Sequence, residues 1–242
     1  MKLNSTKKSI SVVLIMALLV AGGLILYAYS QTWNKTDIEF IIKIDEQIVY
    51  RSAYGESPTF AIWLEDPETG FIQTVYVTRR AAEGDWEGKA DVPVAVPKWF
   101  EIREIEEEMR RQSNQQISDW QPISSPTPLP GYFRTSINVP SGSTWICWIE
   151  VNLAGDYNEI YREFDPVALT YDEYKTGQPP LLYRAEITAK ESIRVKPEII
   201  GMSIIDPEEG VTIQPMSGIT TAKDIFEEIF IEVVRPKPRI LN

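Results

Sequence analysis

One uninterrupted apolar segment near the N-terminus constrains this chain more than any other feature of its sequence. The segment covers residues 10–28, and no charged residue occurs between Lys8 and Lys35. A helix of about 20 residues crosses the roughly 30 Å apolar layer of a bilayer. Lys7 and Lys8 precede the segment, and lysines flanking such a helix stay on the cytoplasmic side. We therefore expect a single-pass helix in the cytoplasmic membrane, with the N-terminus inside and the following domain on the periplasmic or extracellular face.

A cleaved signal peptide is the main alternative for this segment. The sequence Ala28-Tyr29-Ser30 fits a small-residue cleavage site, but the apolar run exceeds the 7–15 residues of a usual signal core. A buried core helix would need an almost wholly apolar surface, which is rare. Anchor and signal both export the rest of the chain. The expected organisation is an anchor or signal (1–30), a polar stalk (31–36), one domain (37–235) and a short tail (236–242).

Histidine and cysteine usage excludes several kinds of chemistry. The chain has no histidine and a single cysteine, Cys147, which rules out histidine-based triads, histidine metal ligands, intrachain disulfides and thiolate clusters. Cys147 lies between apolar residues, so we expect a buried, inert thiol. The net charge of −11 would repel phosphate backbones. We expect no catalytic activity, no cofactor and no nucleic-acid partner.

Short runs of β-branched and aromatic residues, separated by turn residues, predict a mainly β domain. Residues 60–64 and 71–77 flank Asp66-Pro67-Glu68-Thr69-Gly70, whose proline and glycine suit a hairpin turn. The other expected strands cover 38–44, 132–139, 144–153, 181–189, 198–205 and 225–234, and residues 47–51 continue or return from the first. This number and spacing of strands favours an antiparallel β-sandwich.

One short amphipathic helix is expected among the strands. Pro97 suits a first helical turn, and apolar residues then recur at helical spacing: Trp99, Ile102, Ile105 and Met109. Glutamates fill the opposite face. The pattern indicates one apolar stripe packed on the sandwich and one solvated face, with a partner-binding helix as the alternative.

Four local patterns, in order along the chain, carry a resemblance to a known family. They are the hairpin 61–75, Pro97-Lys98-Trp99, residues 148–159 with Gly177-Gln178-Pro179, and residues 217–222. Together they resemble a bacterial family of predicted periplasmic proteins called domain of unknown function 2271. The resemblance implies an immunoglobulin- or fibronectin-like sandwich without catalytic residues, accompanying flavin- or iron-linked membrane redox proteins. The family's D-x-x-S-G-A-T-P loop corresponds to residues 119–128, which lack its glycine, so a site formed there would be altered or lost.

Oxygen-bearing side chains around the fifth expected strand form a weak candidate for a Ca²⁺ site. These candidates are Glu150, Asn152, Asp156, Asn158 and Glu159. Glu150 and Asn152 would share one face of the strand, because alternate residues do. The spacing does not match an EF-hand, and turn-forming roles are the alternative. We therefore assign no metal to these residues.

Exposed aromatic residues are candidates for contacts with a partner. The candidates are Trp86, Trp120, Trp145 and Tyr157. Trp145 and Trp148 differ in strand parity, so one should enter the core while the other is partly exposed. Trp86 and Trp120 lie in expected loops.

These features together predict an accessory or interaction domain, anchored through residues 10–28 and working as a non-catalytic subunit of a membrane complex. One alternative is an exported binding protein for a small ligand or carbohydrate, whose mouth would be the loops around Trp120 and Asp156–Glu159. A second alternative, an accessory domain of a flavin-linked membrane redox system, rests only on the family resemblance.

Overall fold

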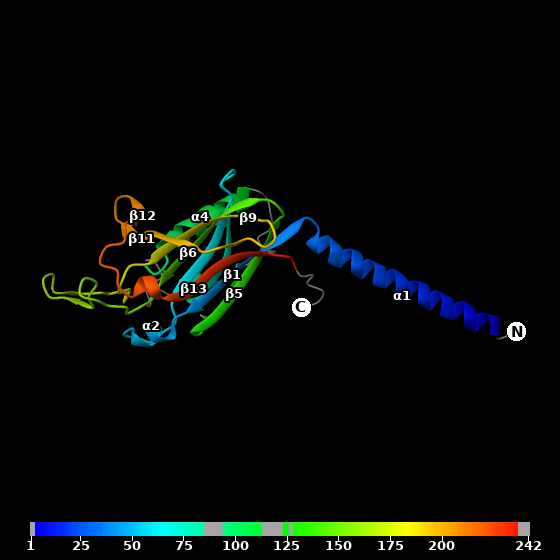
Figure 1. The fold of residues 1–242 in the computed structure, drawn as a ribbon, viewed down its shortest axis with the longest axis horizontal. Helices are drawn as coiled ribbons and strands as arrows, with labels where there is room; N and C mark the ends of the chain where they lie inside the picture. The colour runs from blue at the N-terminus through cyan, green and yellow to red at the C-terminus, as the bar shows by residue number, and fades with distance from the viewer. Residues whose placement is uncertain (1–2, 85–93, 113–122, 126–127, 237–242) are drawn as a thin grey trace.

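Two β-sheets form the body of the protein (Figure 1). The computed structural model describes residues 3–84, 94–112, 123–125 and 128–236. The smaller sheet has the order β10 (Arg194–Val195), β13 (Phe226–Val234), β1 (Lys35–Ile44), β5 (Gly131–Pro140). The larger sheet has the order β12 (Gly210–Gln214), β11 (Glu198–Asp206), β9 (Leu181–Thr188), β6 (Thr144–Asn152), β2 (Thr59–Glu65), β3 (Ile72–Thr78), β4 (Ile123–Ser125). Neighbouring strands are antiparallel except β3 and β4, which are parallel.

One hydrophobic core fills the space between the two sheets. Phe40 and Ile231 of the smaller sheet and Phe60 and Ile149 of the larger sheet belong to the same buried cluster. The ring of Phe60 meets the ring of Phe133 edge to face, with 5.3 Å between centroids. The sheets therefore pack face to face as in a sandwich, and the expected mainly β, antiparallel fold is confirmed.

Every long strand expected from the sequence is present, but residues 47–51 do not form one. They lie in helix α2 (Glu46–Arg51), where the Asp45 carboxylate accepts a hydrogen bond from the Ile48 N–H at 3.0 Å. Asp45 thus caps the helix, since a side-chain acceptor at this position satisfies an otherwise free N–H. The expectation that residues 47–51 continue or return from the first strand was wrong, because the Asp45 cap starts a helix there.

Helix α4 (Pro97–Gln112) covers the outer face of the larger sheet, where Trp99 and Ile102 pack with Trp63 in a second cluster. The expected apolar stripe was partly wrong. Ile105 is 41% exposed, whereas Glu106 is 5% exposed. Glu106 accepts hydrogen bonds from the backbone N–H of Thr74 at 3.0 Å and from its hydroxyl at 2.7 Å. Two buried donors on β3 therefore select a carboxylate at this helix position.

Helix α1 (Leu3–Thr32) extends away from the sandwich at one end of the molecule (Figure 1). Over the described part of the chain, no helix combines the length and hydropathy that crossing a bilayer requires. Only Trp33 and Asn34 separate α1 from β1. The segment 31–36 is therefore not a separate stalk, because its ends belong to the helix and to the first strand.

Candidate functional site

A narrow hairpin projects from the sandwich at the end opposite α1 (Figure 1, yellow-green). It lies in the connection between β6 and β9, and we call residues 159–175 the finger. Its strands β7 (Phe164–Asp165) and β8 (Thr170–Tyr171) pair with each other. The Asp165 carboxylate accepts hydrogen bonds from the backbone N–H groups of Ala168 at 3.1 Å and Val167 at 2.7 Å, and these bonds lower its pKa. The turn thus has a defined conformation although it is fully exposed.

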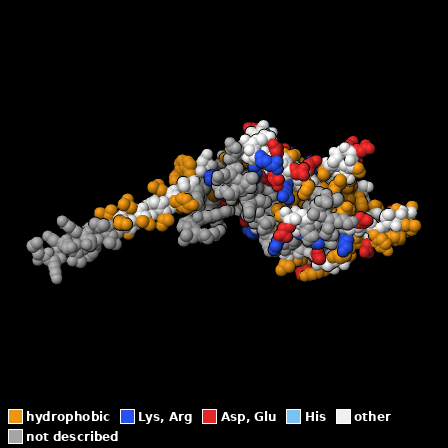
Figure 2. Space-filling view, turned by 180° about the vertical axis from the view of Figure 1, so that it is seen from behind, with side chains coloured by type: hydrophobic (Ala, Val, Ile, Leu, Met, Phe, Trp, Pro, Cys, Tyr) orange, Lys and Arg blue, Asp and Glu red, His pale blue; other side chains and the backbone are white. Residues whose placement is uncertain are grey.

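The tip of the finger is apolar. Val167 is 91% exposed, Leu169 73%, Tyr171 69% and Ile160, nearer the base, 66%. Figure 2 shows hydrophobic side chains gathered at this end of the molecule. Single exposed apolar residues are ordinary, but a contiguous group on a projecting element marks an interaction surface. The finger is therefore the candidate functional site.

A buried polar network fixes the base of the finger to the body. Asp156, 7% exposed, accepts hydrogen bonds from the Thr221 hydroxyl at 2.6 Å and from Gln178 Nε2 at 2.7 Å. Gln178 Oε1 in turn accepts a bond from the Thr220 N–H at 2.6 Å. Burial raises the pKa of Asp156, and the bond from Thr221 opposes that change. These bonds join the two ends of the finger to the loop before β13.

The first turn of the finger is held by a second set of bonds. Asn158 Oδ1 accepts from the N–H groups of Ile160 and Tyr161, while Asn158 Nδ2 donates to the Gly218 carbonyl at 2.9 Å. The Tyr161 hydroxyl donates to the Ser217 carbonyl at 2.8 Å. The third and fourth sequence patterns of the family resemblance, distant along the chain, therefore meet at the base of the finger.

Gly177 permits the close approach of the chain that closes the network. Its φ of +68° is a conformation that favours glycine. An added Cβ would lie 2.7 Å from the backbone nitrogen of Asp156. Asp156 and Gly177 form a β-bridge here, so a side chain at Gly177 would push the two ends of the finger apart.

The five residues proposed as weak Ca²⁺ ligands serve different structural roles. Glu150 is fully buried and accepts hydrogen bonds from the N–H groups of Lys98 at 3.1 Å and Trp99 at 2.7 Å, at the start of α4. Asn152, on the same strand face as expected, donates to the Gln178 carbonyl at 2.9 Å. Glu159 is exposed at the base of the finger. In the described ranges, no three acidic, histidine or cysteine side chains converge where they could hold a metal ion.

Glu150 is a carboxyl group in an unusual environment. Burial raises its pKa to about 7, although the hydrogen bonds it accepts from α4 favour the ionised form. The positive end of the helix dipole acts in the same direction as those bonds. The sequence placed Glu150 correctly on its strand but did not reveal that it caps a helix.

The aromatic candidates for partner contacts lie in different environments. Trp145 is 6% exposed within the core, so its proposed role in partner binding was wrong. Trp148 faces the other side of β6, as parity predicts, where it is partly buried and stacks on Trp63 with 6.1 Å between ring centroids. Tyr157 is half-buried, and its hydroxyl lies 3.3 Å from that of Tyr54. Trp86 and Trp120 lie outside the described residues.

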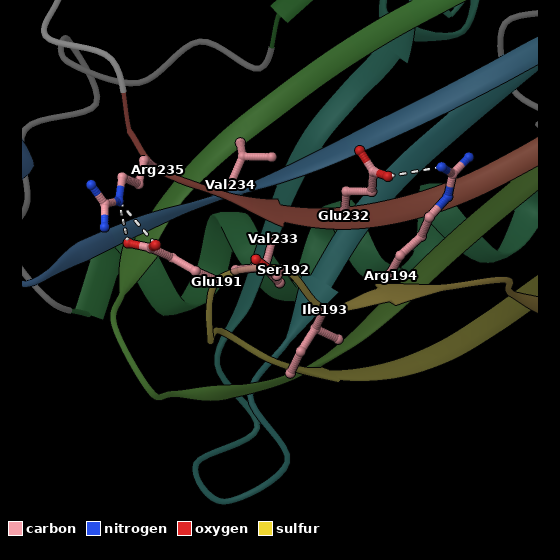
Figure 3. Close-up of a pocket in the computed structure, with 8 residues that line it drawn as sticks. All are labelled: Glu191, Ser192, Ile193, Arg194, Glu232, Val233, Val234 and Arg235. Atoms are coloured by element: carbon pink, nitrogen blue, oxygen red, sulfur yellow. Dashed lines mark hydrogen bonds and ion pairs between the residues drawn. The ribbon is translucent and has the colours of Figure 1, made fainter.

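A groove lined partly by charged residues lies at the edge of the smaller sheet (Figure 3). Its volume is about 340 Å³, and its lining comes from residues 191–194 and 232–235. Figure 3 shows Arg235 facing Glu191 at one end, at 2.8 Å, and Arg194 facing Glu232 at the other, at 3.0 Å. Each charge already has a partner of opposite sign, so the groove offers a ligand little electrostatic attraction.

Comparisons of the chain with models of known protein families, with curated proteins and with solved structures found no match. The candidate site therefore rests on its own geometry. From the sequence, Asp156–Glu159 was expected to border a ligand site, but the finger that follows these residues was missed. The available signal was the run Val167-Ala168-Leu169, three apolar residues in a segment otherwise rich in acid and tyrosine.

Proposed function

We propose that the protein is a membrane-anchored interaction domain outside the cytoplasm, which works as a non-catalytic accessory subunit of a membrane complex. The observation that carries this proposal is the finger. An apolar tip on a hairpin fixed by buried hydrogen bonds suits docking, because little further ordering is needed on binding. Without a binding partner, the apolar side chains of the tip would stay exposed to water, which is unfavourable.

The N-terminal helix supports the anchored part of the proposal. Leu18, Leu19 and Leu26 of α1 are 69%, 70% and 70% exposed, so the helix surface is apolar. Such a surface is stable in lipid or against other transmembrane helices, whereas water disfavours it. The lysines before the helix support an N-terminus on the cytoplasmic side. The finger, at the opposite end, would then project away from this membrane.

An immunoglobulin- or fibronectin-like arrangement remains part of the proposal. The two packed antiparallel sheets are compatible with it, and the specific family rests on the four sequence patterns alone. A binding site for a small ligand and a role beside a flavin-linked redox protein both stay predictions.

Purification of the full chain from native membranes in mild detergent tests the proposed function. We expect a stoichiometric set of membrane proteins with the wild-type chain, and loss of those partners from the double variant Val167→Asp, Leu169→Asp. Leu129→Asp is the matched control, because Leu129 is 82% exposed on a different surface loop. A solitary wild-type chain, or a finger variant that keeps its partners, would contradict the proposal.

A further inference from the structure

The finger carries an excess of acid between its base and its apolar tip. Within residues 159–175 there are five acidic residues and two basic ones, Arg162 and Lys175, a net charge of −3. The acids are Glu159, Glu163, Asp165, Asp172 and Glu173. We call this group the acidic collar.

The hairpin geometry keeps three acids of the collar, Glu163, Asp165 and Asp172, near the tip, while Glu159 lies at the base of the finger. Asp165 pairs with Thr170, and only four residues separate them. The Asp172 N–H donates to the Glu163 carbonyl at 2.9 Å, so these two residues lie opposite each other, two residues further from the tip on each strand. Glu163 and Asp165 are exposed. An object that receives the tip must therefore face carboxylates around its entrance.

We infer that the finger inserts its apolar tip into an apolar cleft of a partner protein whose rim carries lysine or arginine residues. This inference rests on the proposed function and adds the chemistry of the partner. The cleft would bury Val167 and Leu169, while the basic rim would pair with the acidic collar. Complementary charge at a rim directs orientation and accelerates association.

Charge also argues against two other binding partners for the tip, a lipid surface and a second copy of this chain. An anionic lipid surface would repel the acidic collar, because like charges face each other when the tip enters the bilayer. A second copy of this chain is a poor receptor as well, since the chain has a net charge of −11. An apolar cleft with a basic rim, on a different protein, complements both the apolar tip and the acidic collar.

The hairpin is prepared for insertion before binding. The rings of Phe164 and Tyr171 lie 4.8 Å apart across the two short strands, and the Asp165 cap fixes the turn. A preformed tip loses little conformational entropy on docking. The base network in turn holds the finger to the sandwich through the hydrogen bonds of Asp156 and Gln178.

Photo-crosslinking of the full chain in native membranes tests this inference. A photo-reactive residue replaces Val167, and the same residue at Leu129 is the control. We expect position 167 to crosslink to one other protein, through a peptide in which mass spectrometry finds apolar residues flanked by lysine or arginine. We expect no such product from position 129.

Charge reversal then tests the acidic collar. Glu159→Lys with Glu163→Lys should lower the crosslink yield at position 167 at least tenfold, and raising the salt concentration should lower it several-fold for the wild type. Glu208→Lys with Glu209→Lys is the matched control, because it makes the same charge change in the exposed turn between β11 and β12 and should leave the yield unchanged. An unchanged thermal transition in both variants shows that the fold is intact.

Three results would overturn the inference. They are a crosslink from position 167 to lipid, a crosslink to a second copy of the chain, and a protein crosslink that is insensitive to charge reversal at Glu159 and Glu163. If purification still yields a complex in any of these cases, only the partner chemistry is wrong. If the wild-type chain is solitary, the proposed function itself fails.

Discussion

Replacement of Glu150 by glutamine should change how the stability of the protein depends on pH. The carboxyl of Glu150 is fully buried between β6 and the first turn of α4, and its two oxygens accept bonds from Lys98 N–H and Trp99 N–H. Its pKa of about 7 in the folded state compares with an ordinary value of 4.5. The folded protein therefore binds more protons than the unfolded chain between these values.

The magnitude and sign follow from this difference in pKa. A group whose pKa is raised on folding stabilises fully below its unfolded pKa, and this contribution is lost as the pH rises through the folded pKa. The difference corresponds to about 3 kcal/mol of unfolding free energy, lost between pH 4.5 and 7. Glutamine cannot ionise, so its contribution to stability does not depend on pH. Its amide NH₂ group would, however, face one of the two backbone N–H groups and leave that donor without an acceptor, which lowers the unfolding free energy by about 1 kcal/mol.

Urea unfolding of the full chain in mild detergent, followed by tryptophan fluorescence from pH 4.5 to 8, measures this effect. We expect Glu150→Gln to be less stable than the wild type by about 1 kcal/mol at pH 4.5 and more stable by about 2 kcal/mol at pH 8. Glu104→Gln, an exposed change on α4, should follow the wild-type curve. A difference between Glu150→Gln and the wild type that does not vary with pH would refute the reasoning.

Three further predictions concern the base network and the core. Gly177→Ala should destabilise the protein by about 2 kcal/mol through backbone strain and the contact with Asp156, and an unchanged melting temperature would contradict it. Asp156→Ala should cost about 1–3 kcal/mol, because Thr221 and Gln178 lose their acceptor; faster hydrogen exchange in the finger is the confirming measurement. Cys147, whose pKa burial raises, should react with a maleimide only after denaturation, and rapid labelling of the folded chain would disprove its burial.

The strands could be predicted from the sequence because their apolar residues alternate and their turns carry specific residues. The hairpin around residues 66–70 shows this well: Asp66 accepts a bond from the Glu68 N–H at 2.8 Å, and Gly70 has a φ of +69°. The parity of Trp145 and Trp148 likewise assigned them to opposite faces of β6. These inferences needed only local geometry, which the sequence contains.

The features that were missed depend on contacts between distant segments. From the sequence, Glu106 is expected on the solvated face of α4, but in the structure it is buried and accepts two hydrogen bonds from Thr74. Glu150 is likewise a candidate metal ligand in the sequence, whereas in the structure it accepts hydrogen bonds from the first turn of α4. The finger was not predicted because the hydrophobicity of a residue does not show whether its side chain is exposed. Val167 and Leu169 would be assigned to a core by composition alone, and only the fold shows that they face water.

The position of β1 has a consequence for the way the protein is made. β1 lies between β5 and β13, and its residue Asp37 pairs with Val234 near the end of the described chain. Of the strands that the structure describes, β1 is synthesised first and its partner β13 last. Until then Ile38, Phe40 and Ile42 have no complete sheet to cover them, and pairing over such a separation is slow. Truncation before Phe226 should therefore leave a chain whose β1 lacks a partner strand and which is prone to aggregate.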